Sequence, residues 1–177
     1  MVAIDKAHRL ILKAIVTFFG SGLISKKMPG TVGSLCATII VLLLPRSCFL
    51  MLTLAILGFF LGTITSHIYV KKYETDLDPG YIVIDEVAGI FFGIALLYFI
   101  GFQRNIDITL NFCLFRFFDI FKPYPIKNIE NFFSQKPNYT GFAIMIDDII
   151  ASIFSVILQL IITLMFMNNM AGLLILD

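Results

Sequence analysis

The chain has 177 residues, of which 59% are hydrophobic and 14% are charged, and its formal net charge is +1. Soluble domains contain about 25% charged residues, so this composition excludes an ordinary soluble protein and indicates a membrane protein. The near-neutral charge leaves no basic surface for nucleic acid, which excludes that class of partner.

The length of the chain limits its architecture. It accommodates roughly five membrane-spanning helices of about 20 residues each, joined by short loops. No room is left for a separate soluble domain. We therefore predict an all-α fold, a polytopic membrane helix bundle that forms a single integral membrane domain over residues 1–177.

The predicted helices follow the apolar runs of the sequence. Residues 6–19 form an amphipathic pattern, which predicts a helix lying at the membrane interface, with a re-entrant segment as the alternative. Five apolar runs then predict membrane spans at residues 32–44, 48–70, 85–102, 107–120 and 145–167. The run at 48–70 is the clearest because its 23 residues carry no formal charge. The run at 107–120 is short for a bilayer, so we expect four to five spans.

The distribution of lysine and arginine predicts the orientation of these spans. With the N-terminus in the cytoplasm, 11 of the 13 Lys and Arg residues fall on the cytoplasmic side, and Arg46 and Arg104 fall on the other. Positive charge accumulates on cytoplasmic loops. We therefore predict a multi-pass protein whose N-terminus faces the cytoplasm.

Two Gly-x-x-x-Gly pairs occur in the predicted spans, Gly58/Gly62 and Gly89/Gly93. Such pairs let two helix backbones approach closely. We expect them to pack helices within the bundle. They also permit a dimer, so the oligomeric state stays open.

Four polar segments lie at the predicted cytoplasmic surface, and the first is Met28 to Ser34, which leads into the first span. Its glycines allow backbone N–H groups to converge ahead of a helix N-terminus, an arrangement that suits a phosphate group. The simpler interpretation is a Pro/Gly turn capped by Thr31. The segment is not a P-loop because the Gly-Lys-Ser/Thr ending is missing.

The second segment places acids inside a hydrophobic stretch. Asp85 and Glu86 follow three apolar residues and precede an apolar helix. The helix dipole favours acids at an N-terminus, which is the structural explanation. Two adjacent carboxylates at membrane depth are nevertheless unfavourable without a partner. A divalent cation such as Mg²⁺ would supply that partner, and we favour this functional interpretation.

The third segment, Phe115 to Ile126, combines basic and acidic residues. Arg116 and Asp119 lie three residues apart on one helix face, where they could form a purely structural ion pair. An Arg and a Lys beside acidic groups also suit a phosphate, because Arg donates two parallel hydrogen bonds and Lys supplies a compact charge. Arg116 and Lys122 are therefore candidate phosphate-binding residues, and a snorkelling Lys122 is the alternative.

The fourth segment, Gly141 to Asp148, ends in two more acids at the expected start of the last span. Two embedded acid pairs at one surface are less expected by chance than one. We therefore predict a divalent cation site formed by Asp85, Glu86, Asp147 and Asp148, with Asp78 as a further candidate ligand.

These four segments closely resemble those of the phosphatidylglycerophosphatase A family. The resemblance rests on GTVGSL at 30–35, DPGYIVIDEVAG at 78–89, FRFFDIFKPYPI at 115–126 and GFAIMIDDIIA at 141–151, in the order of that family. It covers most of the chain, from about Gly20 to Ala151. No polar position of the four motifs departs from the family pattern.

The resemblance implies a single integral membrane catalytic domain, a Mg²⁺-dependent phosphatase of the bacterial inner membrane with its active site facing the cytoplasm. Its substrate would be the phospholipid phosphatidylglycerophosphate, hydrolysed to phosphatidylglycerol and inorganic phosphate in the last step of phosphatidylglycerol biosynthesis. The implied catalytic residues are Asp85, Glu86, Arg116, Asp119, Lys122, Asp147 and Asp148. The implied phosphate-binding residues are Gly30, Thr31, Gly33, Ser34, Arg116 and Lys122.

Several features of the reaction stay open at this point. Asp119 is expected to orient Arg116, but the general acid, the number of metal ions and the attacking group (water or an aspartate) are not assigned. A CDP-alcohol phosphotransferase would also use carboxylates and metal, but its Asp-Gly-x-x-Ala-Arg signature is absent. A small ion-coupled transporter would carry acids near mid-span, and a non-catalytic scaffold would leave the four polar segments unexplained.

Overall fold

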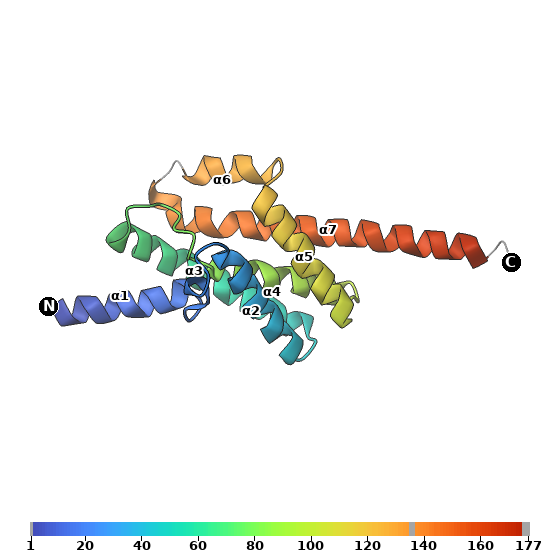
Figure 1. Ribbon diagram of the computed structural model, residues 1–177, viewed down its shortest axis with the longest axis horizontal. Helices are drawn as coiled ribbons and strands as arrows, with labels where there is room; N and C mark the ends of the chain where they lie inside the picture. Colours follow the sequence, from blue (N-terminus) through green and yellow to red (C-terminus); the bar gives the residue numbers. More distant parts are fainter. Residues whose placement is uncertain (1, 135–136, 175–177) are drawn as a thin grey trace.

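The computed structural model describes residues 2–134 and 137–174, and all regular structure in these ranges is helical. This confirms the all-α prediction (Figure 1). The α-helices in chain order are α1 (Val2–Val16), α2 (Pro29–Leu43), α3 (Cys48–Tyr73), α4 (Ile84–Phe99), α5 (Asn105–Phe121), α6 (Ile126–Ser134) and α7 (Thr140–Leu174). Two short 3-10 helices, η1 (Ser21–Leu23) and η2 (Pro137–Tyr139), precede α2 and α7.

Two helices differ from the sequence prediction. Helix α6 was not predicted, because it is amphipathic and follows two prolines, so neither hydropathy nor the proline pattern indicates it. Helix α7 begins at Thr140, five residues before the predicted start of the last span. Asp147 and Asp148 therefore lie about two turns inside α7 rather than at its N-terminus.

Helix α4 is the centre of the bundle. It contacts α2, α3, α5 and α7, and it is buried along nearly all of its length from Ile84 to Tyr98. Its sequence explains this position, because apolar residues occupy every face of the helix after its first turn. The central helix thus has no polar side except at its first turn, where Asp85 and Glu86 lie.

Glycines allow the helices to approach α4 and α7 closely. A Cβ atom at Gly89 would lie 2.8 Å from Phe115 Cε2, and one at Gly93 would lie 2.6 Å from Ser152 Oγ. On α3, a Cβ atom at Gly62 would lie 2.6 Å from the sulfur of Met145. The prediction that the Gly-x-x-x-Gly pairs pack helices within the bundle is confirmed for these contacts.

One interhelical hydrogen bond fixes how α7 sits along α4. The hydroxyl of Ser152, which is fully buried, donates to the carbonyl oxygen of Gly89 at 2.8 Å. Each of these residues lies one helical turn after an acidic pair, Asp147–Asp148 on α7 and Asp85–Glu86 on α4. The bond therefore sets the two acidic pairs at the same level of the bundle.

We expect Ser152→Ala to lower the free energy of unfolding by about 1 kcal/mol, because it removes this buried interhelical bond and leaves the Gly89 carbonyl without its donor. The measurement is a reversible denaturant titration in detergent micelles. Thr53→Ala is the control, since the exposed Thr53 hydroxyl donates within its own helix, to the Phe49 carbonyl. Equal unfolding curves for wild type and Ser152→Ala would contradict the expectation.

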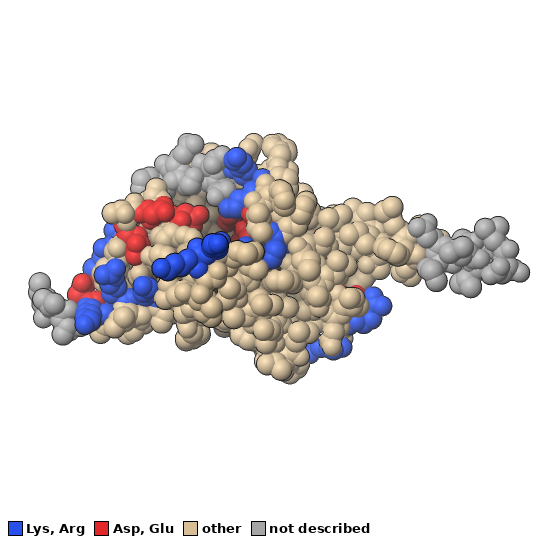
Figure 2. Space-filling model, in the orientation of Figure 1, with Lys and Arg blue, Asp and Glu red and all other residues tan. Residues whose placement is uncertain are grey.

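Within the described ranges of the chain, two helices are long and apolar enough to cross a membrane, α3 and the Thr140–Asn168 part of α7, whereas α2 is a shorter apolar helix. Large apolar side chains cover the outward face of α3; Phe49 is 81% exposed and Phe60 is 62% exposed. Figure 2 shows charged residues gathered over the left part of the molecule, a smaller charged group at the lower right of its body, and uncharged surface between them. The predicted count of four to five spans stays a prediction.

Candidate active site

Five carboxyl groups from three helices meet at the charged end of the bundle. Asp85 and Glu86 come from the first turn of α4, Asp119 from the last turns of α5, and Asp147 and Asp148 from α7. Ligand oxygens of Asp85, Glu86 and Asp148 lie within 4.8 Å of one another, and so do those of Asp119, Asp147 and Asp148. We call these five residues the carboxylate cluster. Asp148 belongs to both groups and joins them.

Arg116 crosses the cluster from α5. Its Nη1 atom lies 2.5 Å from Asp119 Oδ2, three residues further along the same helix, and 3.7 Å from Glu86 Oε1 on α4. All three side chains are nearly buried. The predicted pairing of Arg116 with Asp119 is confirmed, and the guanidinium also links α5 to α4. Because Asp119 restrains it, the guanidinium has a fixed direction toward the cluster.

Lys122 brings a second positive charge to the cluster. It caps the C-terminus of α5, directly after Phe121, and has a left-handed conformation with φ of 40°. Its Nζ atom lies 2.6 Å from Asp147 Oδ2. The side chain of Asp147 is 8% exposed, so this ion pair is shielded from water. Both candidate phosphate-binding cations therefore border the cluster.

The cluster fits a divalent cation such as Mg²⁺. Arg116 and Lys122 balance at most two of the five carboxylate charges. Among the described residues, the buried oxygens that have no hydrogen-bond partner include Asp85 Oδ1, Glu86 Oε2 and Asp148 Oδ2. These atoms belong to the three residues of one group. Buried carboxylate oxygens without donors are favourable ligands for a hard cation and are unfavourable without one.

The first turn of α2 closes the cluster on a further side. A Cβ atom at Gly30 would overlap Glu86 Oε1 and would lie 3.2 Å from Arg116 Nη1. The backbone at Gly30 can therefore approach the carboxylate and guanidinium groups only because the residue lacks a side chain. The glycine motif of the sequence is explained here by close approach of the α2 backbone to Glu86.

The structure places the other predicted phosphate-binding residues inside α2 rather than in a loop. Gly33 packs against Val83, since a Cβ atom there would lie 2.6 Å from the Val83 Cβ. The buried hydroxyl of Ser34 donates to the Gly30 carbonyl at 2.7 Å. Thr31 is partly exposed in the first turn. A phosphate-binding role for these three residues stays a prediction.

Two positions show what the sequence alone did not reveal. Asp119 was expected only to orient Arg116, yet it is one of the carboxyl groups that could hold a cation. The i, i+3 spacing on α5 indicated the ion pair but not the approach of α7. Asp78, the further candidate ligand, is exposed in the loop before α4, and the structure does not group it with the cluster.

Comparisons with known proteins agree with the motif pattern. The family model for phosphatidylglycerophosphatase A matches residues 14–163. Phosphatidylglycerophosphatase A of Haemophilus influenzae is 41% identical over 144 residues, covering 78% of this chain and 80% of the relative. The corresponding protein of Escherichia coli K12 is 33% identical over 140 residues, covering 77% and 74%. A putative phosphatidylinositol-3-phosphatase of Bacteroides thetaiotaomicron is 36% identical over 151 residues, covering 81% and 88%. No solved structure matches the chain significantly.

The matched region includes every residue of the carboxylate cluster, together with Gly30, Arg116 and Lys122. It omits most of α1 and the last turns of α7, which lie away from the cluster. The similarity therefore covers the part of the bundle that builds the site. The chain belongs to the phosphatidylglycerophosphatase A family.

Proposed function

We propose that this protein is a membrane lipid phosphatase that hydrolyses phosphatidylglycerophosphate to phosphatidylglycerol and inorganic phosphate with Mg²⁺. The observation that carries the proposal is the carboxylate cluster with Arg116 and Lys122 at its border. Family membership supplies the substrate class, since two of the relatives are phosphatidylglycerophosphatases. One relative bears the name of a different lipid phosphatase, so a phosphomonoester on a lipid is the feature common to these names.

The side chains suggest a division of roles. Asp85, Glu86 and Asp148 would hold Mg²⁺, and Asp119 and Asp147 could complete its ligands or hold a second ion. When bound, the metal would polarise the phosphoryl group and activate a water molecule. Arg116, oriented by Asp119, and Lys122 would neutralise the nonbridging oxygens of the phosphate. The Gly30 backbone would confine Glu86 from the α2 side.

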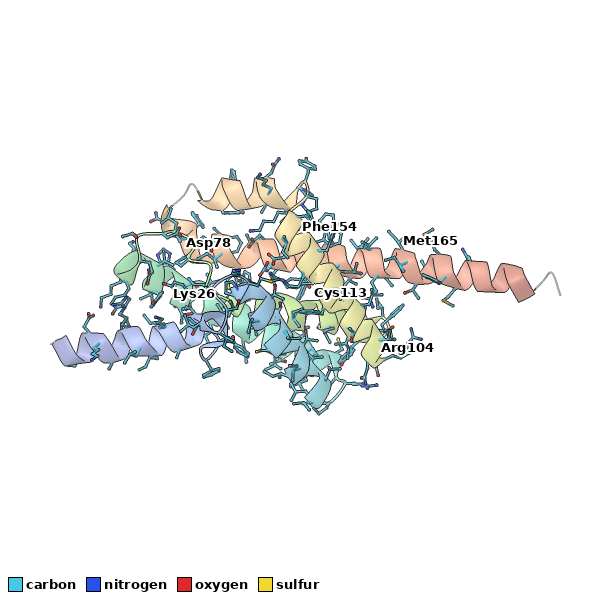
Figure 3. The ribbon with its side chains drawn as sticks, in the orientation of Figure 1. Lys26, Asp78, Arg104, Cys113, Phe154 and Met165 are labelled. Atoms are coloured by element: carbon cyan, nitrogen blue, oxygen red, sulfur yellow. The ribbon has the colours of Figure 1, made fainter. Side chains whose placement is uncertain are left out.

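The proposal includes a multi-pass position in the bacterial inner membrane, with the N-terminus and the site at the cytoplasmic face. Lys26 lies near the start of α2, and Arg104 lies well away from it, at the start of α5 (Figure 3). This separation agrees with the charge asymmetry of the sequence. Of the predicted cytoplasmic cations, Lys136 lies outside the described residues. An oligomer is permitted and is not part of the proposal.

The test is phosphate release from phosphatidylglycerophosphate by detergent-purified protein in Mg²⁺ or EDTA. We expect release that is abolished by EDTA and restored by excess Mg²⁺. Mg²⁺ should also raise the unfolding temperature, because it compensates the charge of the buried carboxylates in the folded state only. Folded protein that releases no phosphate with any divalent metal would overturn the proposal, and uptake by proteoliposomes would then favour the transporter.

A further inference from the structure

A pocket with a volume of about 400 Å³ lies beside the first turn of α2, and none of the carboxylate-cluster residues lines it. Its walls come from the η1–α2 loop, including Leu23, Lys26 and Pro29, and from Gly80 and Tyr81 in the loop before α4. The proposed phosphatase mechanism does not use any of these residues. The volume of the pocket lies in the range of small-molecule binding sites, and the pocket is open to the surface.

The pocket is adjacent to the proposed reaction site. Pro29, which lines the pocket, is followed directly by Gly30, whose backbone contacts the Glu86 carboxylate and approaches Arg116. The first turn of α2 thus borders both the pocket and the carboxylate cluster. A group bound in the pocket would therefore neighbour a phosphate bound at Arg116.

The two loops that form the pocket are held firmly together. A Cβ atom at Gly22 would overlap the carbonyl oxygen of Tyr81 and would lie 2.9 Å from Val83 Cγ1. The backbone N–H of Val83 donates to the carbonyl oxygen of Val16 at 2.9 Å. The pocket therefore has a fixed shape, set by the close contact of η1 with the loop before α4.

The charge of the pocket suits an anion. Lys26 supplies a positive charge at its wall, and Figure 3 shows this residue beside the start of α2. Burial raises the pKa of the Tyr81 hydroxyl further above neutral pH, so Tyr81 itself adds no negative charge to the pocket. Lys26 itself is exposed and carries the charge that an anionic group would meet first.

The rim of the pocket suits a lipid. Leu23 is 49% exposed, Ile24 is 74% exposed and Met28 is 54% exposed, and the three surround Lys26 and Lys27 in the same loop. Exposed apolar side chains next to lysines are typical of the boundary between hydrocarbon and headgroups, where the apolar parts enter the acyl region and the ammonium groups stay among phosphates. A lipid held here could keep its acyl chains in the membrane.

We propose that this pocket binds the phosphodiester of the lipid substrate, with Lys26 as its cation, while the terminal phosphomonoester lies at the carboxylate cluster. The inference rests on the proposed function and makes it more specific. Phosphatidylglycerophosphate carries two phosphates joined by a three-carbon glycerol unit, and the cluster accounts for only one of them. The pocket selects lipids whose phosphomonoester is separated from a phosphodiester by such a short linker.

The chain offers a matched pair of variants, Lys26→Gln and Lys27→Gln. Both lysines are exposed neighbours in one loop and both variants remove one positive charge, but only Lys26 lines the pocket. In mixed micelles we expect Lys26→Gln to raise KM for phosphatidylglycerophosphate about tenfold, the effect of losing a charge-assisted contact. The kcat should stay within about twofold, because the reacting phosphate is held elsewhere. Lys27→Gln should leave both constants near those of the wild type.

A second measurement does not depend on activity. Native mass spectrometry should show binding of phosphatidylglycerol, which has the phosphodiester but no phosphomonoester, to the wild type and Lys27→Gln and weaker binding to Lys26→Gln. Equal effects of the two variants would indicate general surface charge and would overturn the assignment. A fall in kcat with unchanged KM would also overturn it, since Lys26 would then act on the reacting phosphate. If phosphatidylglycerol binds selectively but the protein releases no phosphate, the assignment of the pocket stands and the proposed phosphatase function is wrong.

Discussion

Replacing Asp85 by asparagine is expected to reduce phosphate release by a factor of about 10³ or more, because a metal ligand contributes several kcal/mol to the stabilisation of the transition state. Asparagine has the shape of aspartate but lacks its charge. Asp85 Oδ1 has no hydrogen-bond partner in the described part of the protein, so the lost function is ligation rather than a structural contact. The measurement is the initial rate of phosphate release at saturating Mg²⁺.

Although Asp85→Asn should lower the activity, it should make the protein more stable in the absence of metal. In EDTA the carboxylates of the cluster repel one another, so removing one charge should raise the unfolding temperature by about 2–4 °C. The stabilisation by Mg²⁺ should become smaller, because one ligand is lost. Asp76→Asn is the control, an exposed carboxylate in the loop before α4 for which we expect no change. Wild-type activity of Asp85→Asn would show that Asp85 is not a metal ligand of the active site.

Gly30→Ala should lower phosphate release by about 10²-fold, the size of effect expected when catalytic groups shift by about 1 Å. The added methyl group would overlap Glu86 Oε1, so the carboxylate has to leave the position in which it meets Arg116. The fold should persist because alanine is favourable in the first turn of α2. Circular dichroism and the elution volume in detergent would verify that the variant is folded.

Gly58→Ala is the matched control for this substitution. It makes the same chemical change inside a helix of the bundle, but the nearest atom to its Cβ would be Ala88 Cβ at an ordinary contact distance of 3.4 Å. We therefore expect wild-type activity from Gly58→Ala. If both glycine variants lost activity equally, a general response to tighter helix packing would explain the loss, and the specific role of Gly30 would be wrong.

The sequence predicted the helices of this protein where hydropathy determines them. The run without formal charge at 48–70 corresponds to α3, and the embedded acids Asp85 and Glu86 lie at the start of α4. Amphipathic α6 was missed because its apolar residues are spread over one face and do not form a run. The early start of α7 was missed because Gly141 interrupts the apolar pattern, although it lies in the helix.

The composition of the site was predictable, but its connections were not. Each acid was visible because a charged residue in an apolar stretch is unfavourable. The partners depend on tertiary packing: Arg116 reaches Glu86 on another helix, and Lys122 reaches Asp147, 25 residues further along the chain. The closeness of Gly30 to Glu86 depends on backbone positions in two helices. No local sequence pattern encodes such a distance.

The short central helices have a consequence for the surrounding bilayer. With 16 residues α4 is about 24 Å long, and α5 with 17 residues is about 26 Å, less than the roughly 30 Å of bilayer hydrocarbon. In the proposed multi-pass arrangement, the bilayer would adapt to this hydrophobic mismatch by becoming thinner around the protein. The plane of lipid phosphates would then be drawn inward, toward the first turn of α4. The protein would meet its substrate by deforming the leaflet, without extracting the lipid from it.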